Sequence, residues 1–376
     1  MNPDEKKVIK ADEPLTERKK SILRAIVQDY VESAEPVGSK ALLTRHQLGI
    51  SSATVRNEMA ELEEEGYLEQ PHTSSGRVPS DKGYRAYVDD MLTLREIPET
   101  DKQRLEEELE ANVHEIQSLI RQAAGVLSEE TELASLVLTP TYGSSTLRQI
   151  KILMIEPGRA LVVVVLSAGI VRDRLIQVPG SLSQEQLREI AEAVEKHLSG
   201  RKLEDISLVT VTDAGQQEAI PDVLLNQVLF ETYLSIKQAE NIDVYLQGSH
   251  RLLEQPEFSD VKKAHRFLNT INQNGLVAGY LSELQDDVKA EEGQPAYAVR
   301  IGQEIALEGM EDCSFVSSSY RIGHEIRGKI AVIGPKRMLY SKIISDVSFI
   351  NQSLNRLIRR GLGGQMKEGW EDEDKM

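Results

Sequence analysis

Cysteine is almost absent from this sequence, and its scarcity limits the kind of protein that the chain can be. Cys313 is the only cysteine among 376 residues. A single thiol cannot form an internal disulfide, so the chain is not a disulfide-stabilised secreted domain. We expect Cys313 to be a small buried side chain rather than a reactive nucleophile.

Long hydrophobic runs are also missing. No apolar stretch approaches the roughly 18 residues that a membrane-spanning helix requires. Residues 1–14 are polar and mixed in charge, and they lack the apolar centre of a secretion signal. These features predict a cytoplasmic protein that does not associate with a membrane.

The motifs of common enzymes are absent as well. The seven histidines are scattered without metal-ligand spacing, and no nucleophile elbow or dinucleotide fingerprint occurs. Residues 323–329, GHEIRGK, have the glycine and lysine spacing of a phosphate loop. However, Ile330 stands where a hydroxyl would have to hold Mg²⁺, and a strand follows, so we expect a hairpin turn. We predict no catalytic residues, no cofactor and no metal.

Positive charge is in short supply. The formal net charge is −17, and residues 1–95 hold 14 Lys and Arg against 17 Asp and Glu. A nucleic-acid-binding protein usually presents a basic patch. Any DNA-binding surface of this chain must therefore arise from local separation of charge.

Three short helices are predicted in the first 66 residues. Residues 16–34 place their apolar side chains on one face, with Thr16 as a candidate N-cap and Pro36 just beyond the end. Residues 39–46 form a short amphipathic helix, the turn 47–50 carries Gly49, and residues 51–66 form the third helix. Two short helices joined by a tight turn are typical of a helix-turn-helix.

The third helix has side chains suited to reading bases. Its apolar stripe must face the core, which leaves Thr54, Arg56 and Asn57 on the opposite face near the N-terminal end. Arginine pairs with guanine, asparagine with adenine, and threonine offers a hydroxyl or a methyl contact. The acidic residues at 61 and 63–65 lie at the far end, away from the bases.

Residues 67–80 predict a β-hairpin directly after this helix, as in a winged helix-turn-helix. Arg77 is expected at the hairpin tip as a minor-groove or phosphate contact, and the neighbouring amides can also meet phosphates. A helix-turn-helix can instead bind only protein, but the hairpin favours DNA. The predicted DNA-binding residues are Lys40, Arg45, Ser51, Ser52, Thr54, Arg56, Asn57, Ser74, Ser75, Gly76, Arg77, Lys82 and Arg85.

Three stretches of the sequence closely resemble the heat-inducible transcription repressor family HrcA. They are LTERKKSILRAIVQDYVESAEPVGSKAL, ISSATVRNEMAELEEEGYLEQPHTSSGRVPSDKGYRAYVD and, far downstream, GKIAVIGPKRMLYSKIISDVSFINQSL. The N-terminal match is long and nearly continuous. Together with the C-terminal block, the resemblance covers most of the chain.

The middle of the chain begins with a heptad stripe from Leu105 to Leu127. It predicts a helix that either forms a coiled coil with a second subunit or packs on its own domain. Three β-rich runs follow at 147–177, then a helix at 183–199. Strands return at 315–334, and a helix at 345–360 closes the chain. This order suggests one α+β domain interrupted by an insertion.

The resemblance implies that the interrupted domain is GAF-like and that the inserted domain mediates dimerisation. The predicted divisions are a disordered N-terminus (1–14), a winged-helix DNA-binding domain (15–95), a linker helix (100–130), a GAF-like domain (131–204 and 276–362), an inserted dimerisation domain (205–275) and a disordered acidic tail (363–376). Residues 224–238 form an amphipathic helix suited to a subunit contact or to a core.

The resemblance also implies a function. A homodimer would bind an inverted-repeat operator on double-stranded DNA and repress class I heat-shock operons that encode chaperonin and DnaK-type chaperones. The chaperonin GroE would support the active fold, and heat would lift repression by withdrawing that support. The alternative is a repressor whose GAF-like domain senses a small molecule.

Overall fold

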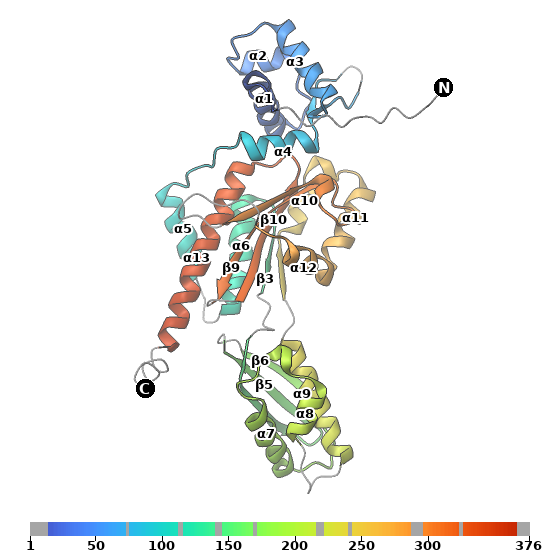
Figure 1. Cartoon of the computed structure of the whole chain (residues 1–376), viewed down its shortest axis with the longest axis vertical. Coiled ribbons are helices and arrows are strands. Elements are labelled where there is room, and N and C mark those ends of the chain that lie inside the picture. The colour runs from blue at the N-terminus through green and yellow to red at the C-terminus, as the bar shows by residue number, and fades with distance from the viewer. Residues whose placement is uncertain are drawn as a thin grey trace, which may run out of the picture.

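The protein is an α+β molecule in which three units follow one another along the long axis (Figure 1). The computed structural model describes residues 14–72, 75–111, 116–139, 145–167, 171–215, 222–239, 243–286, 296–322 and 326–366. We call the three units the N-terminal unit (14–91), the central unit (92–139 and 243–366) and the inserted unit (145–239). None of the helices described is long and apolar enough to cross a bilayer.

The N-terminal unit contains the three predicted helices and the hairpin. Its elements are α1 (Glu17–Ser33), α2 (Ser39–Arg45), α3 (Ser52–Glu64), β1 (Leu68–Glu69), β2 (Val78–Pro79) and α4 (Asp81–Asp90). Thr16 caps α1 as predicted, because its hydroxyl accepts from the Lys19 amide, and Ala34 ends the helix in the left-handed region (φ 54°). The core of the unit consists of apolar side chains from α1, α2 and α3, among them Ile22, Ile26, Leu42, Val55 and Leu62.

The central unit is built on an antiparallel sheet of order β7-β3-β10-β9-β8. Its strands are β3 (Ala134–Leu138), β7 (Val244–Gln247), β8 (Tyr297–Ile301), β9 (Cys313–Ile322) and β10 (Ile326–Pro335). In β3, Val137 lies opposite Ile330 of β10 on one side and Tyr245 of β7 on the other. The strand is thus hydrogen-bonded along both edges.

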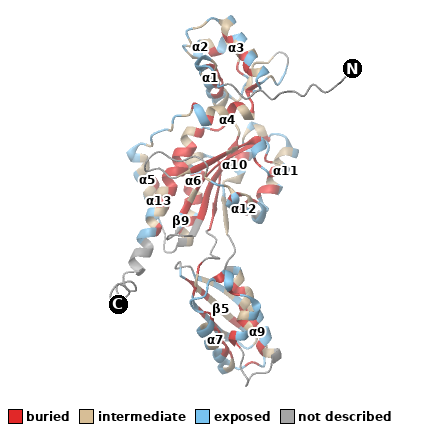
Figure 2. Cartoon of the chain, viewed as in Figure 1, coloured by how far each residue is buried: buried red, intermediate tan, exposed pale blue. Residues whose placement is uncertain are grey.

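Helices cover both faces of this sheet, so its strands are buried on both sides (Figures 1 and 2). Side chains alternate along each strand. Val137, Ile330 and Val332 pack toward α6 (Ile116–Thr131) and α13 (Tyr340–Met366). Leu136 and Ile333 belong to a second core with α10 (Ser249–Leu253), α11 (Val261–Ile271) and α12 (Asn274–Glu283). Two cores on one sheet explain why most side chains of these strands are buried on both faces.

The heptad stripe forms two helices of the central unit rather than one continuous linker helix. α5 (Glu99–Glu110) ends at Ala111, which has an extended backbone, and α6 begins at Ile116. Leu105, Leu109 and Leu127 are fully buried within the chain's own core. The stripe is therefore explained by packing on its own domain; Val113 lies outside the described residues.

The inserted unit is a separate three-stranded sheet with helices on one face. Its elements are β4 (Leu147–Glu156), β5 (Arg159–Leu166), β6 (Val171–Gln177), α7 (Gln184–Leu198), α8 (Leu208–Gly215) and α9 (Asp222–Ala239). The strands pair in the order β4-β5-β6 as two antiparallel hairpins. α9 buries Leu225, Val228 and Leu229 in this unit, so the amphipathic helix at 224–238 is a core helix.

The boundaries of the insertion differ from the prediction of 205–275. The strands at 147–177 form their own sheet instead of extending the domain predicted at 131–204, while β7, α10 and α11 belong to the central unit. The β-strand pattern was correct, but an alternating pattern does not specify which strands pair. The helix α13 also extends to Met366, into the predicted disordered tail; residues 1–13 and 367–376 lie outside the described residues.

Cys313 is fully buried at the start of β9, as expected for an apolar side chain. Burial raises the pKa of its thiol, because a thiolate would lose its hydration there. β9 ends directly before the sequence GHEIRGK, β10 begins within it at Ile326, and the two strands are antiparallel partners. The hairpin predicted there is confirmed, although residues 323–325 lie outside the described part.

Two adjacent leucines of α10 test the second core. Leu252 is fully buried, whereas Leu253 is 39% exposed. We expect Leu252→Ala to lower the free energy of unfolding by about 2–5 kcal/mol. Leu253→Ala should lower it by no more than about 1 kcal/mol, since its side chain already contacts water. Chemical denaturation of both variants measures the difference, and equal losses would contradict the packing described.

Candidate nucleic-acid interface

The N-terminus of α3 is fixed by two hydroxyl groups. The Ser51 hydroxyl accepts from the Thr54 amide at 3.1 Å and lies 2.9 Å from the Thr54 hydroxyl. Gly49 adopts the left-handed backbone (φ 65°) that the preceding turn requires. The free amides of a helix N-terminus favour a nearby anion, including phosphate. α3 therefore begins at a place suited to approach a DNA backbone.

The outer face of α3 presents the predicted base-reading side chains. Arg56 and Asn57 are exposed, while Val55, Met59 and Leu62 are buried on the opposite side. Ser52 and Thr54 are half-buried at the edge of the exposed face. The periodicity of the sequence thus predicted correctly which face of α3 is exposed.

The acidic residues toward the end of α3 are paired within the unit. Glu58 lies 3.3 Å from Arg18, and Glu61 and Glu65 lie 2.9 and 2.5 Å from the Lys19 ammonium. Hydrogen bonds to Glu65 and Glu61 hold the pKa of Lys19 above its usual value. These three carboxylates are thus paired with cations of α1, while Arg56 and Asn57 remain exposed.

The hairpin after α3 is compact, and Arg77 lies directly before β2, where the loop joins the strand, rather than at the tip. Arg77 forms a β-bridge with Val37, and its guanidinium lies 2.7 Å from the Glu63 carboxylate. The predicted tip position was wrong because the paired strands are only two residues long and Arg77 joins the strand-like segment at Val37. Arg77 therefore connects the hairpin to α3.

Two of the predicted tip residues lie in a tight turn. The Ser75 amide donates to the His72 carbonyl at 2.9 Å, and its hydroxyl donates to the same carbonyl. At Gly76 an added Cβ would lie 2.4 Å from the Val37 carbonyl oxygen, so only glycine fits. Ser74 lies outside the described residues.

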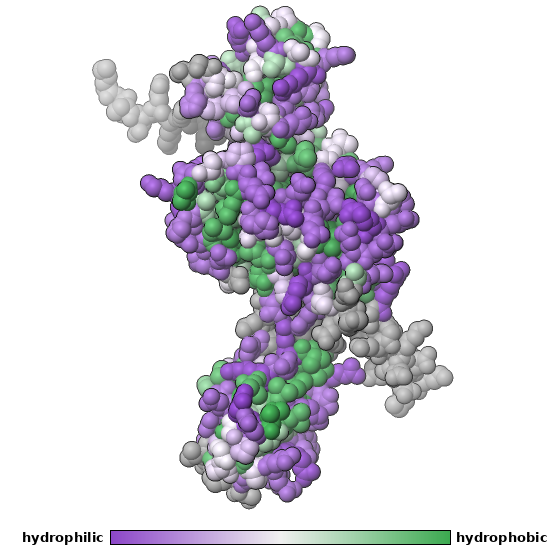
Figure 3. Space-filling model, turned by 180° about the vertical axis from the view of Figure 1, so that it is seen from behind, coloured by the Kyte–Doolittle hydropathy of each residue, from purple (hydrophilic) through white to green (hydrophobic). Residues whose placement is uncertain are grey.

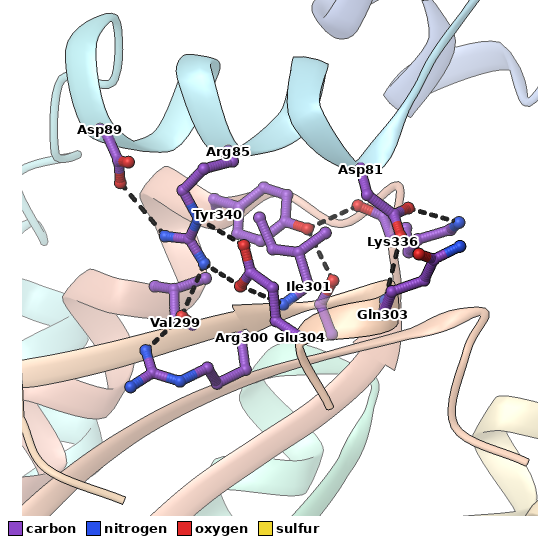
Figure 4. Close-up of polar contacts among 11 residues, drawn as sticks. Asp81, Arg85, Asp89, Val299, Arg300, Ile301, Gln303, Glu304, Lys336 and Tyr340 are labelled. Carbon is purple, nitrogen blue, oxygen red and sulfur yellow. Dashed lines mark hydrogen bonds and ion pairs between the residues drawn. The ribbon is translucent and has the colours of Figure 1, made fainter. Parts of the chain in front are cut away.

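The four predicted flanking cations differ in their surroundings. Lys40 and Arg45 are exposed on α2, where Arg45 also lies 3.4 Å from Asp29. Lys82 lies over the ring of Tyr67, 4.3 Å from its centroid. Arg85 points from α4 toward Glu304 and Val299 of the central unit (Figure 4), so the structure gives it a different role from the one predicted.

That role is a polar contact between α4 and the central unit (Figure 4), which we call the α4 contact. Arg85 donates to the Glu304 carboxylate at 2.8 Å and to the Val299 carbonyl at 2.8 Å. Burial alone would lower the pKa of Arg85, but hydrogen bonding to Glu304 raises it above the usual value. Asp81 accepts from the Lys336 ammonium at 2.7 Å and from the Gln303 amide at 3.0 Å.

Sequence reasoning missed this contact. The one available signal was the spacing of Asp81, Arg85 and Asp89, which places three charged side chains on one helical face. Such a face is usually exposed to solvent, and nothing in the sequence indicates that Glu304 and Lys336 lie opposite.

A cavity of about 920 Å³ lies between the N-terminal and central units. It is lined by cationic groups, among them Arg24 and Arg95, and by the carboxylates of Asp29 and Glu32. His46 lies 2.8 Å from Asp29 in its wall. The mixed charges match no single class of small molecule.

Comparison with known proteins identifies the class of protein. The family model described as HrcA protein C terminal domain matches residues 117–344. The heat-inducible transcription repressor HrcA of Ruminiclostridium cellulolyticum is 39% identical over 345 residues, covering 92% of this chain and 97% of that protein. The repressor of the same name from Desulfitobacterium hafniense is 37% identical over 346 residues, covering 92% and 98%.

A solved structure shares the fold. The crystal structure of a hypothetical protein at 2.2 Å resolution superimposes with a TM-score of 0.60 and 21% identity, covering 92% of this chain and 99% of that one. The chain thus shares the fold of this solved structure and is similar in sequence to proteins named heat-inducible transcription repressors. It belongs to the HrcA family.

The N-cap of α3 provides a test of how this interface is built. We expect Ser51→Ala to lower the free energy of unfolding of the N-terminal unit by about 1 kcal/mol, because the Thr54 amide loses its acceptor. Ser51→Asn, which keeps a capping oxygen, serves as the control and should remain close to the parent. Hydrogen exchange of the α3 amides measures both. If the two variants behaved alike, the cap would not be what stabilises the start of this helix.

Proposed function

We propose that the protein is a winged helix-turn-helix repressor that binds an inverted-repeat operator as a homodimer and silences class I heat-shock operons. Relatives over nearly the whole chain are named heat-inducible transcription repressors. The observation that carries the proposal is the division of charge on α3. Arg56 and Asn57 are exposed, while Glu58, Glu61 and Glu65 are paired with α1.

In this proposal α2 and α3 form the helix-turn-helix, and β1 and β2 form the wing. α3 enters the major groove, where Arg56 contacts guanine and Asn57 contacts adenine. The remaining contacts go to the phosphates and position the protein on the duplex. The proposed interface comprises Lys40, Arg45, Ser51, Ser52, Thr54, Arg56, Asn57, Ser75, Gly76 and Lys82, with Ser74 kept as a prediction from the sequence.

Dimerisation would use the inserted unit. The face of its sheet turned away from the helices has large exposed apolar side chains: Leu153 is 51% exposed, Ile155 57%, Val171 55% and Leu175 47%. Leu153 and Leu175 flank Leu161 in neighbouring strands. Figure 3 shows hydrophobic residues gathered on this unit. An apolar face of this kind favours association with a matching face of a second copy.

The central unit corresponds to the proposed GAF-like domain, and heat would release repression when the chaperonin GroE is diverted to other unfolded proteins. The alternative is a small-molecule sensor in that domain. The described side chains on the two sides of its sheet are mostly apolar, and the buried polar groups of Lys329 and Asn351 pair with Asp286 and Ser318 of the same unit. This packing favours a structural role over ligand sensing.

Arg56 provides the direct test of DNA binding. We expect Arg56→Ala to weaken binding to the inverted repeat upstream of the organism's own chaperonin operon by about 5- to 150-fold, the cost of losing a bidentate base contact. Thermal unfolding should not change, because the side chain is exposed. Arg188→Ala, which removes an exposed cation from α7, is the matched control.

A gel-shift titration against the operator and a scrambled duplex measures this effect, with and without purified chaperonin. The proposal requires sequence-specific binding by the parent protein that chaperonin improves and brief heating abolishes. Equal, weak binding to both duplexes would refute it. Binding that responded to a metabolite and not to chaperonin would support the sensor alternative.

The dimer is tested by charge placed on the apolar sheet face. Leu153→Lys and Leu175→Lys should each weaken self-association at least about tenfold, since a buried lysine has no partner there. The control is Val209→Lys, which changes another exposed apolar residue on α8 of the same unit. Sedimentation equilibrium distinguishes the cases. An unchanged dimer in both leucine variants would place the interface elsewhere.

A further inference from the structure

α4 is part of the N-terminal unit. The Ser80 hydroxyl donates to the Gly66 carbonyl at 2.6 Å, and the Gly83 amide donates to the same hydroxyl at 3.0 Å. An added Cβ at Gly83 would lie 2.1 Å from the Tyr67 carbonyl oxygen. The helix therefore packs so closely on the end of the hairpin that the two must move together.

The other side of α4 is held in one orientation by the α4 contact. The carboxylate of Asp81 meets a lysine, and four residues later the guanidinium of Arg85 meets a carboxylate. Because the two charges on the helix have opposite signs, sliding α4 by one turn would bring like charges together. These side chains are only 25% to 34% exposed, so water screens them less than it would at an open surface.

The backbone of the central unit is shaped around this contact. Gly302 has a left-handed backbone (φ 53°), and an added Cβ would lie 2.2 Å from a carboxylate oxygen of Asp81. The Glu304 carboxylate also accepts from the Ile301 amide at 3.0 Å, which fixes it before it meets Arg85. The receiving side is therefore preorganised.

The segment that follows α4 is also attached to the central unit. The Ser341 hydroxyl donates to the Thr93 carbonyl at 2.5 Å, and the Ser345 hydroxyl donates to the Arg95 carbonyl at 2.7 Å. Both serines lie on α13. These hydrogen bonds therefore restrict movement of the N-terminal unit relative to the central unit.

We propose that the α4 contact determines which spacing between operator half-sites the dimer accepts, with Asp81, Arg85, Gly302, Glu304 and Lys336 as positioning residues. This inference depends on the proposed function, binding of an inverted repeat by a dimer. A dimer selects a spacing only if both recognition helices are held rigidly, because each added base pair rotates the second half-site by about 35°. Here the link from α3 to the rest of the dimer passes through α4.

The experiment compares the affinities of the full-length dimer for duplexes whose half-sites are separated by the natural spacer or by spacers one, two and five base pairs longer. We expect the parent protein to lose at least about tenfold in affinity when the spacer grows by two base pairs. In Glu304→Arg and in Gly302→Ala that loss should fall to about threefold or less. Affinity for a duplex with a single half-site should stay within about twofold, because neither residue lies in the proposed interface.

Two controls separate this effect from misfolding. The double variant Arg85→Glu, Glu304→Arg restores an opposite-charge pair and should recover part of the spacing selectivity. Glu192→Arg makes the same charge change on the exposed face of α7 and should leave the spacing profile unchanged. Thermal unfolding and sedimentation confirm that each variant is a folded dimer.

The outcomes are distinct. A spacing profile in Glu304→Arg and Gly302→Ala identical to that of the parent overturns the inference and leaves the proposed function intact. So does tighter binding at the natural spacing with an unchanged profile, since the contact would then oppose DNA binding. If the parent protein bound no inverted repeat at any spacing, the proposed function itself would fail.

Discussion

The fold depends on β3, a five-residue strand whose two neighbours both come much later in the chain. One edge pairs with β7 at 244–247 and the other with β10 at 326–335. The chain must therefore leave the sheet after β3, form the inserted unit and return beside the strand it left. The Thr139 amide donates to the Asp243 carbonyl at 2.9 Å, and the Asp243 amide donates to the Thr139 hydroxyl at 2.7 Å. Thr139 and Asp243, the described residues between which the inserted unit leaves and rejoins the central unit, thus lie side by side.

Charged residues of opposite sign are separated within single helices rather than between the three units of the protein. The chain has a net charge of −17, yet on α3 the carboxylates of Glu58 and Glu61 pair with α1, whereas the proposed base-reading side chains Arg56 and Asn57 are exposed. Pairing with α1 lets an acidic protein present a polar, cationic side chain at the place where a phosphate backbone would approach. A net charge summed over a segment therefore says little about the surface that a partner meets.

Local features could be predicted from the sequence, and long-range ones could not. The caps at Thr16 and Ser51 and the buried stripe of α3 depend on residues within one or two turns, so periodicity and capping rules located them. The strands of the inserted unit were found for the same reason. Their assignment to a separate sheet could not be found, because hydrophobic alternation is the same whichever strand is the partner.

The candidate site shows the same division. The exposure of Arg56 and Asn57 follows from the face opposite Val55 and Met59. The position of Arg77 depends on its bridge to Val37, some forty residues earlier, and that of Arg85 depends on Glu304 in another unit. From the sequence alone, an arginine or lysine on a surface helix that pairs with another part of the protein cannot be distinguished from one that contacts DNA.

The late pairing of β3 also has a consequence for synthesis on the ribosome. All five residues of β3 are buried in the finished sheet, but β10 is translated long after them. At about 5–20 residues per second, the strand emerges on the order of ten seconds or more before its last partner exists. Throughout that interval the nascent chain carries an apolar strand with an open edge, the kind of segment that aggregates unless another molecule shields it.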